Sequence, residues 1–189
     1  ELNLDRFTLL NDFEAVALSV PHLEKSDLQQ IGPGKVIPEA PIGVIGPGTG
    51  LGVACLFWDG FKYCAVPGEG GHVTMPAQTQ REYDVFETLK ADKYSHISAE
   101  RVCSGKGLVN IYNALRIMDK RTDLPDRTPE EISAAALKGE CELSGEALDM
   151  MIRFLGSVTG NLAVTIGAFG GIFIAGGIDI FRHNGRLNP

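Results

Sequence analysis

The stretch that decides the fold runs from residue 42 to residue 66 and reads IGVIGPGTGLGVACLFWDGFKYCAV. It contains three apolar runs typical of β-strands, at residues 42–45, 51–57 and 61–66. Asp59-Gly60 lies between the second and third runs and favours a hairpin turn, because both residues tolerate positive φ. The sequence therefore predicts that consecutive strands pair here.

The segments on either side of this stretch alternate between helical and strand patterns. A short apolar run at residues 7–10 predicts a strand, and residues 31–43, rich in Gly and Pro, predict a surface loop. Helices are expected to begin at Asn11-Asp12 and to cover residues 80–91, 107–118, 129–138 and 145–167. A buried strand is expected at residues 171–175. Strands alternating with helices predict an α/β layered fold.

Composition limits the classes of function that remain. The 189 residues are 44% hydrophobic, which excludes a disordered chain and suits one good-sized domain or one lobe of a larger protein. The chain carries 17 Lys and Arg against 24 Asp and Glu, a formal net charge of −7. No basic cluster interrupts this acidic balance, so neither nucleic acid nor an anionic membrane surface is expected as a partner.

The cysteine spacing and the first residues of the chain indicate the cellular compartment in which the protein is expected. Cys55, Cys64, Cys103 and Cys141 form no C-x-x-C pair, so we expect buried thiols of a reducing compartment. No basic segment followed by an apolar run opens the chain, so no signal peptide is predicted. A cytoplasmic location is therefore expected. The chain begins at Glu1 and ends at Pro189, and we expect it to be a fragment of a longer one.

Residues 154–178 carry no charge and are long enough to suggest a membrane helix. Glycine pairs at 170–171 and 176–177 would break such a helix. We therefore expect a buried helix followed by a buried strand.

The loop at residues 46–52, Gly-Pro-Gly-Thr-Gly-Leu-Gly, separates the first two predicted strands. It has neither the glycine spacing of a dinucleotide fingerprint nor the Gly-Lys-Ser/Thr of a Walker-type loop, and both are rejected. Two interpretations stay open. The turn either directs backbone N–H groups and the Thr49 hydroxyl toward a phosphate, or it is a plain glycine-rich turn.

The loop at residues 67–72, Pro-Gly-Glu-Gly-Gly-His, follows the third predicted strand. Its glycines pull the backbone tight and bring Glu69 and His72 close together, and loops of this kind commonly carry function. The alternative is a solvated turn in which both side chains face water.

Two further acidic groups stand at expected helix starts. Asp12 is placed to cap the helix that follows it. Glu100 follows Ser98, a suitable N-cap residue, and the first turn of a helix favours a negative charge. Neither segment indicates catalysis by itself.

In combination, these groups suit a polyhydroxylated neutral ligand beside a nucleotide. Carboxylates accept hydrogen bonds from hydroxyls, and each charge-assisted bond contributes about 1.5–3 kcal/mol. Such a site discriminates between sugar epimers, because a missing hydroxyl leaves a buried acceptor without a partner.

The same motifs resemble, in family order, the successive blocks of bacterial-type glucokinases. The matching blocks span nearly the whole chain, at residues 10–15, 48–52, 67–72, 97–101, 104–112 and 173–178. The resemblance implies the actin-like ATPase (ribonuclease H-like) fold, an α/β fold with two lobes around a cleft. It implies transfer of the γ-phosphoryl group of MgATP to the 6-hydroxyl of glucose. This chain would be mainly the large lobe, a mixed sheet flanked by helices.

The resemblance also implies roles for individual residues. Asp12 would be the general base that takes the proton of the 6-hydroxyl. The other sugar hydroxyls would be held by Asn11, Glu69, His72 and Glu100. The nucleotide would meet a phosphate turn at Gly48 and Thr49 and an adenosine-side turn at Gly176 and Gly177. Without the family, the last pair is equally a tight strand-to-helix turn. No residue is assigned to a metal, because Mg²⁺ in such sites is held mainly by the nucleotide and water.

Parts of the family pattern do not occur in these residues. The Asp-x-Gly-Gly-Thr phosphate loop, the strands of the small lobe and the returning C-terminal helix are absent from the sequence. We expect residues 1–30 to form a hinge strand and helix bearing the Asn-Asp motif, and residues 31–189 to form the large lobe with its phosphate, sugar and adenosine turns. Acting alone, this lobe should bind MgATP poorly and glucose weakly.

Other classes of function compete with a glucose kinase. A non-catalytic sugar-binding or regulatory member of the same superfamily, or an inactive fragment, is the first alternative. Asp12 argues against a pure binding protein, and the sequence shows neither the cysteine-rich zinc loop nor the basic DNA-binding domain typical of regulatory members. The glycine spacing of residues 46–52 argues against a nicotinamide-dependent oxidoreductase. Glucose and ATP are the expected partners, and a homodimer is one assembly that the resemblance allows.

Overall fold

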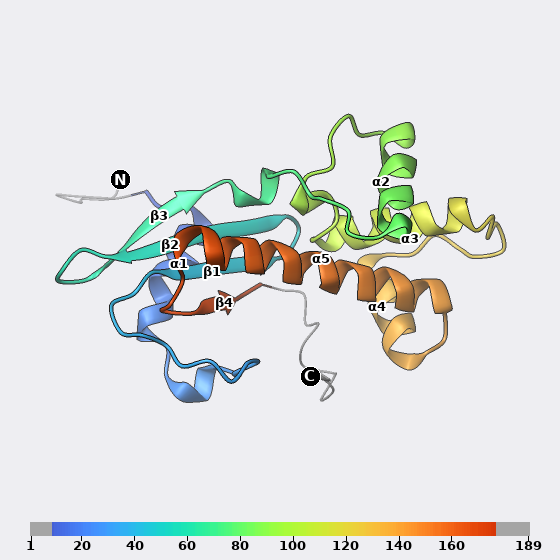
Figure 1. Cartoon of the computed structure of the whole chain (residues 1–189). Helices are drawn as coiled ribbons and strands as arrows, with labels where there is room; N and C mark the ends of the chain where they lie inside the picture. The colour runs from blue at the N-terminus through green and yellow to red at the C-terminus, as the bar shows by residue number, and fades with distance from the viewer. Residues whose placement is uncertain (1–8, 177–189) are drawn as a thin grey trace, which may run out of the picture.

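A four-stranded mixed sheet occupies one half of the computed structural model (Figure 1), which describes residues 9–176. Its strands are β1 (Ile42–Pro47), β2 (Leu51–Trp58), β3 (Tyr63–Gly68) and β4 (Ile172–Ile174), in the order β3-β2-β1-β4. β1, β2 and β3 are antiparallel neighbours, whereas β4 lies parallel to β1. The three strands predicted between residues 42 and 66 and the mixed sheet are confirmed.

The turn between β2 and β3 forms where the sequence predicts it, but it spans residues 59–62 and only Gly60 of the Asp-Gly pair has a positive φ. The Asp59 side chain accepts hydrogen bonds from the backbone N–H groups of Phe61 (2.8 Å) and Lys62 (2.9 Å), and Gly60 has a φ of +100°. These bonds lower the pKa of Asp59. The hairpin is therefore held by local chemistry that the sequence displays.

Five α-helices accompany the sheet in the described residues. They are α1 (Asp12–Ser19), α2 (Gln80–Asp92), α3 (Gly105–Met118), α4 (Pro129–Lys138) and α5 (Glu142–Ile166). The bounds of α4 agree with the prediction, because a capping box at Thr128 and Glu131 and Pro129 at the first position mark its start. α5 begins before the expected Gly145, because its N-cap, Cys141, makes no side-chain capping bond that the sequence could announce.

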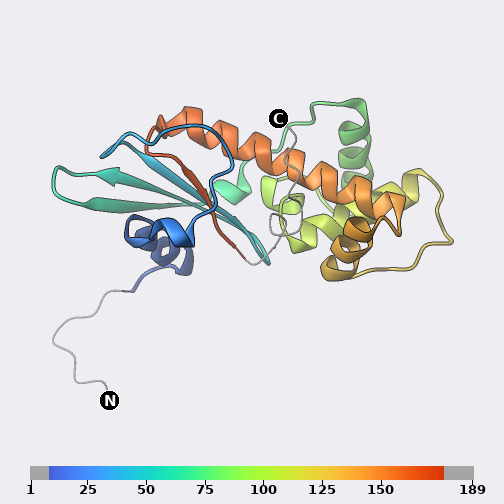
Figure 2. The same ribbon diagram turned by 90° about the horizontal axis from the view of Figure 1, so that it is seen from below.

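Helices cover both faces of the sheet. α1 packs on β2 and β3, whereas α5 crosses the opposite face over β1 (Figures 1 and 2). Neighbouring residues of β1 therefore enter different clusters: Val44 packs on the α1 side and Ile45 on the α5 side. Within the described residues, no helix is long and apolar enough to span a bilayer. The prediction of a helix followed by a strand in residues 154–178 is confirmed up to residue 176, where the description ends, but the predicted burial is wrong. From residue 154 to the end of α5 only Phe154, Leu155 and Val158 are buried, and β4 is half-buried throughout.

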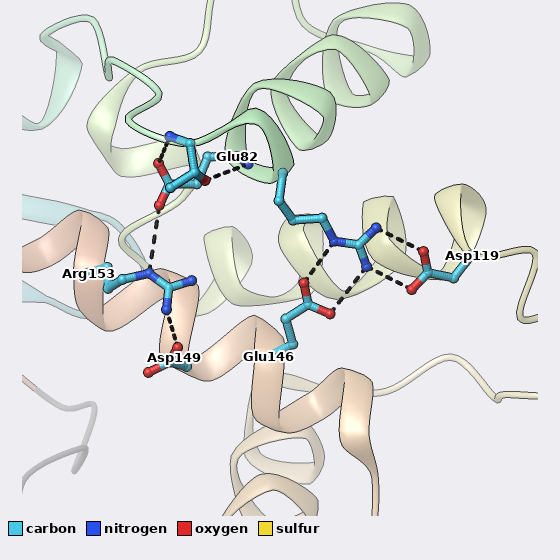
Figure 3. Close-up of polar contacts among 7 residues, drawn as sticks. Glu82, Asp119, Glu146, Asp149 and Arg153 are labelled. Atoms are coloured by element: carbon cyan, nitrogen blue, oxygen red, sulfur yellow. Dashed lines mark hydrogen bonds and ion pairs between the residues drawn. The ribbon is translucent and has the colours of Figure 1, made fainter.

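α2, α3 and α4 gather at the far end of α5, beyond the sheet (Figure 1). Arg81 of α2 connects three of these helices. Its guanidinium donates hydrogen bonds to Asp119 at the end of α3 (2.7 and 2.9 Å) and to Glu146 of α5 (2.8 and 3.2 Å) (Figure 3). A charge-assisted network of this kind helps to orient the helices that it joins.

Several expectations from the sequence need correction. Leu9 and Leu10 lie outside any strand, and residues 7 and 8 of the predicted strand lie outside the described residues. Only Cys103 and Cys141 are buried, and burial raises the pKa of Cys103 to about 12. Cys55 and Cys64 are half-buried, because α5 crosses their face of the sheet mainly over β1 rather than over β2 and β3.

Candidate active site

A cavity of about 580 Å³ opens where α1 meets the turn between β1 and β2. Seven of the residues that the sequence analysis selected line it: Asn11, Asp12, Gly48, Thr49, Glu69, Glu100 and Gly176. They come from segments far apart in the chain and converge here because β1, β3 and β4 end, and β2 begins, at this edge of the sheet. The volume is typical of a pocket for a small molecule. His72 is not part of the lining, and Gly177 lies outside the described residues.

The residue that caps α1 is Asn11 and not, as predicted, Asp12. The Asn11 side chain is the helix cap, since its Oδ1 accepts a hydrogen bond from the N–H of Phe13 (2.8 Å). Asp12 is the first residue of α1, and its Oδ1 also accepts from Phe13 (2.8 Å). Its Oδ2 accepts no hydrogen bond from any described residue. This oxygen belongs to an exposed residue of the cavity lining and is available to accept a proton.

Phe13 holds this helix start in place, a role that the sequence analysis missed. Gly46 and Gly52 are paired across β1 and β2, and the Phe13 ring lies directly on them. A Cβ added at Gly52 would come within 2.3 Å of the ring, and one at Gly46 within 2.6 Å. The sequence signal for this contact was the presence of two glycines in neighbouring strands. Glycines without side chains leave space on the sheet for a bulky side chain from another element.

The turn between β1 and β2 is anchored to a helix. Within the turn, the N–H of Gly48 donates to the carbonyl of Gly50 (2.8 Å). The N–H of Gly105, the first residue of α3, donates to the carbonyl of Gly48 (2.9 Å). Thr49 is exposed at the tip. A fixed turn with an exposed hydroxyl can present polar groups to a phosphate.

Glu100 lies in the short 3-10 helix Ala99–Arg101 and reaches back to this turn. Its Oε2 accepts a hydrogen bond from the N–H of Leu51 (3.2 Å), the first residue of β2. The expected cap was wrong in one detail: Ser98 occupies the N-cap position, but its side chain makes no capping bond.

Glu69 and His72 lie close together, as the glycine loop predicts. Oε2 of Glu69 is 3.6 Å from Nε2 of His72. Both side chains are exposed, Glu69 by 84% and His72 by 63%. Of the two, only Glu69 lines the cavity.

Gly176 lines the cavity beyond β4 with a φ of +128°. A Cβ at this position would lie 2.4 Å from the carbonyl oxygen of Pro47. The position therefore requires glycine for structural reasons, whatever it binds.

Carboxylates from separate elements face this cavity without forming a metal cage. Among residues 9–176, no group of three His, Cys, Asp or Glu side chains is placed to hold a metal ion. The donor set of the cavity, with the Thr49 hydroxyl and the Asp12 carboxylate, suits an Mg²⁺ ion that arrives on a nucleotide and keeps its waters.

The strand order and the position of this cavity define a protein of the actin-like ATPase fold. The family model described as Glucokinase matches residues 1–184. The chain belongs to the glucokinase family.

Individual relatives agree with this assignment. The chain is 46% identical over 178 residues to a glucokinase of Aromatoleum aromaticum, covering 94% of this chain and 53% of the relative. The crystal structure of a glucokinase from an Antarctic psychrotroph is similar with a TM-score of 0.81 at 36% identity, covering 89% of this chain and 52% of the other. A glucokinase of Balamuthia mandrillaris, solved in complex with glucose, shares the fold with a TM-score of 0.78 at 24% identity, covering 88% and 50%. The chain thus spans about half the length of these relatives.

Proposed function

We propose that this chain supplies the large lobe of a kinase that transfers the γ-phosphoryl group of ATP to the 6-hydroxyl of glucose. The observation that carries the proposal is the single cavity shared by Asp12, the sugar-side carboxylates Glu69 and Glu100, and the Gly48-Thr49 turn. Membership of the glucokinase family supports the same reaction. Residues 1–30 would form the hinge segment, and a small lobe would close the other wall of the cleft.

Asp12 is the general base in this proposal. Its Oδ2 takes the proton of the 6-hydroxyl as the hydroxyl oxygen forms a bond to the γ-phosphorus. The bond between the γ-phosphorus and its bridging oxygen breaks, and ADP leaves with that oxygen. Such a reaction depends on alignment and charge stabilisation more than on covalent chemistry. The helix start of α1, fixed by Asn11 and Phe13, supplies that alignment.

The remaining polar groups orient the two substrates. Asn11, Glu69 and Glu100, from three separate segments that line the cavity, hold sugar hydroxyls, and His72 assists through its contact with Glu69. Gly48 and Thr49 meet the phosphates, and Gly176 with Gly177 receives the adenosine. Mg²⁺ carried by ATP would neutralise charge on the transferred group. The glucose complex of the Balamuthia relative supports glucose as the sugar.

Replacing Asp12 tests the proposal. In a coupled assay of ADP release on the full-length enzyme that carries this chain, Asp12→Asn should lower glucose-dependent turnover by about 10²- to 10⁴-fold. The matched control is Asp92→Asn, an exposed carboxylate outside the cavity, which should leave turnover unchanged. Turnover that survives Asp12→Asn would overturn the assignment of the base. Glucose binding without any ADP release by the unmodified enzyme would favour the regulatory alternative.

A further inference from the structure

The Glu100 carboxylate lies between the sugar side of the cavity and the phosphate turn, residues 48–51. We propose that Glu100 is also a positioning residue for this turn, and that it thereby couples sugar binding to nucleotide binding. The inference rests on the proposed function, and it adds a role on the nucleotide side to a residue expected only to hold a sugar hydroxyl.

Direct contacts tie Glu100 to the turn. Oε2 accepts the hydrogen bond from the N–H of Leu51 (3.2 Å), where the turn leads into β2. The same oxygen lies over Gly50, because a Cβ added there would come within 2.5 Å of it. The carboxylate therefore packs against the backbone of the turn as well as accepting from it.

The backbone of Glu100 is itself held in place by the residue that caps α3. Its backbone carbonyl accepts a hydrogen bond from the hydroxyl of Ser104 (2.7 Å), the residue that caps α3. The first N–H of α3, from Gly105, in turn donates to Gly48. The turn is thus attached to one rigid unit at both ends, through Gly48 to α3 and through Leu51 to Glu100.

The carboxylate has a second oxygen for the sugar. In the described part of the chain, Oε1 of Glu100 accepts no hydrogen bond, and Glu100 lines the cavity that Asp12 and Glu69 share. A sugar hydroxyl that donates to Oε1 would restrain the side chain whose Oε2 holds Leu51. Binding on one side therefore orders the other, and the coupling must act equally in both directions.

Glu69 offers a matched comparison. It is a glutamate in the same cavity with a proposed sugar contact, but its only described polar side-chain contact is with His72. Loss of the Glu69 carboxylate should weaken sugar binding alone. Loss of the Glu100 carboxylate should weaken both substrates.

Steady-state kinetics of the full-length enzyme can separate these roles. For Glu100→Ala we expect the KM for glucose to rise about 10- to 100-fold and the KM for ATP about 3- to 10-fold, because a charge-assisted and a backbone hydrogen bond are both lost. Glu100→Gln keeps an oxygen that can accept from Leu51, so its KM for ATP should stay at the unmodified value while its KM for glucose rises. Glu69→Gln should raise only the KM for glucose.

Each possible result either supports or overturns the positioning role of Glu100. Rescue of the KM for ATP by Glu100→Gln, with unfolding midpoints alike in all variants, supports the positioning role. Glu100→Ala with an unchanged KM for ATP would overturn the inference and leave the proposed function intact. An equal rise of the KM for ATP in Glu69→Gln would also overturn it. Absence of glucose-dependent ADP release in the unmodified enzyme would overturn the proposed function itself.

Discussion

Phe13 shows how a single side chain sets the geometry of the cavity. Its ring fills the space that Gly46 and Gly52 leave open, and it follows Asp12 directly in the first turn of α1. The position of the proposed base relative to the phosphate turn therefore depends on an aromatic contact that bears no charge. Close packing of this kind tolerates little change in volume.

Changing either side of this contact tests its importance. Gly52→Ala should destabilise the chain by about 1–3 kcal/mol, because the new methyl group overlaps the ring. Phe13→Ala should also destabilise, through lost burial. The double variant should cost less than the sum of the two, since the methyl group then occupies space that the ring has left. Urea unfolding measures all three, and additive losses would contradict the contact. Phe61→Ala, at the 91% exposed hairpin tip, is the control and should be neutral.

Among the elements, the junction of α2, α3 and α5 relies on a charged network. Hydrogen bonds to Asp119 and Glu146 raise the pKa of Arg81, and the bond from Arg81 lowers the pKa of Asp119 (Figure 3). A second pair also joins α2 to α5: Oε1 of the buried Glu82 is 3.7 Å from Nε of the exposed Arg153. These contacts join helices that the sequence predicts, but the sequence does not predict how the helices are arranged relative to one another.

The network gives stability a dependence on pH. Because the pKa of Asp119 is lowered by folding, its ionised form stabilises the protein above the ordinary Asp pKa, and this contribution is lost as the pH falls through the lowered value. Arg81→Met should cost about 1 kcal/mol at pH 7, and the cost should shrink in acid. Urea unfolding across this pH range checks it. Lys90→Met, which breaks an exposed pair with Glu87 within α2, should change stability little at either pH.

For the whole molecule, the cavity has only one wall among the described residues. It is built by α1, the sheet edge and the Glu69 and Glu100 loops, and nothing in residues 9–176 closes it from the opposite side. We expect the 189-residue chain alone to bind glucose at least about tenfold more weakly than the full-length enzyme, because it lacks the small lobe that we propose closes the cleft. Calorimetric titration of both proteins measures the difference. Equal affinities would show that the large lobe alone forms the sugar site.

The elements of this protein were determined largely by local sequence. Turn chemistry at Asp59-Gly60, the capping box before α4 and apolar periodicity act over a few residues, so the strands and most helix bounds could be predicted. The motifs at Asn11-Asp12, residues 46–52 and 67–72 could be identified, with roles implied by family resemblance. Starts without a side-chain cap, as at α5, could not.

Only the tertiary structure determined how these motifs contact one another. Phe13 packs α1 onto Gly46 and Gly52, and Glu100 accepts a hydrogen bond from Leu51, forty-nine positions away in the chain. Each contact joins segments that are distant in sequence, and their distance is set by how the sheet and helices pack. No local pattern encodes such a distance, because many arrangements of the same elements satisfy the same apolar periodicity.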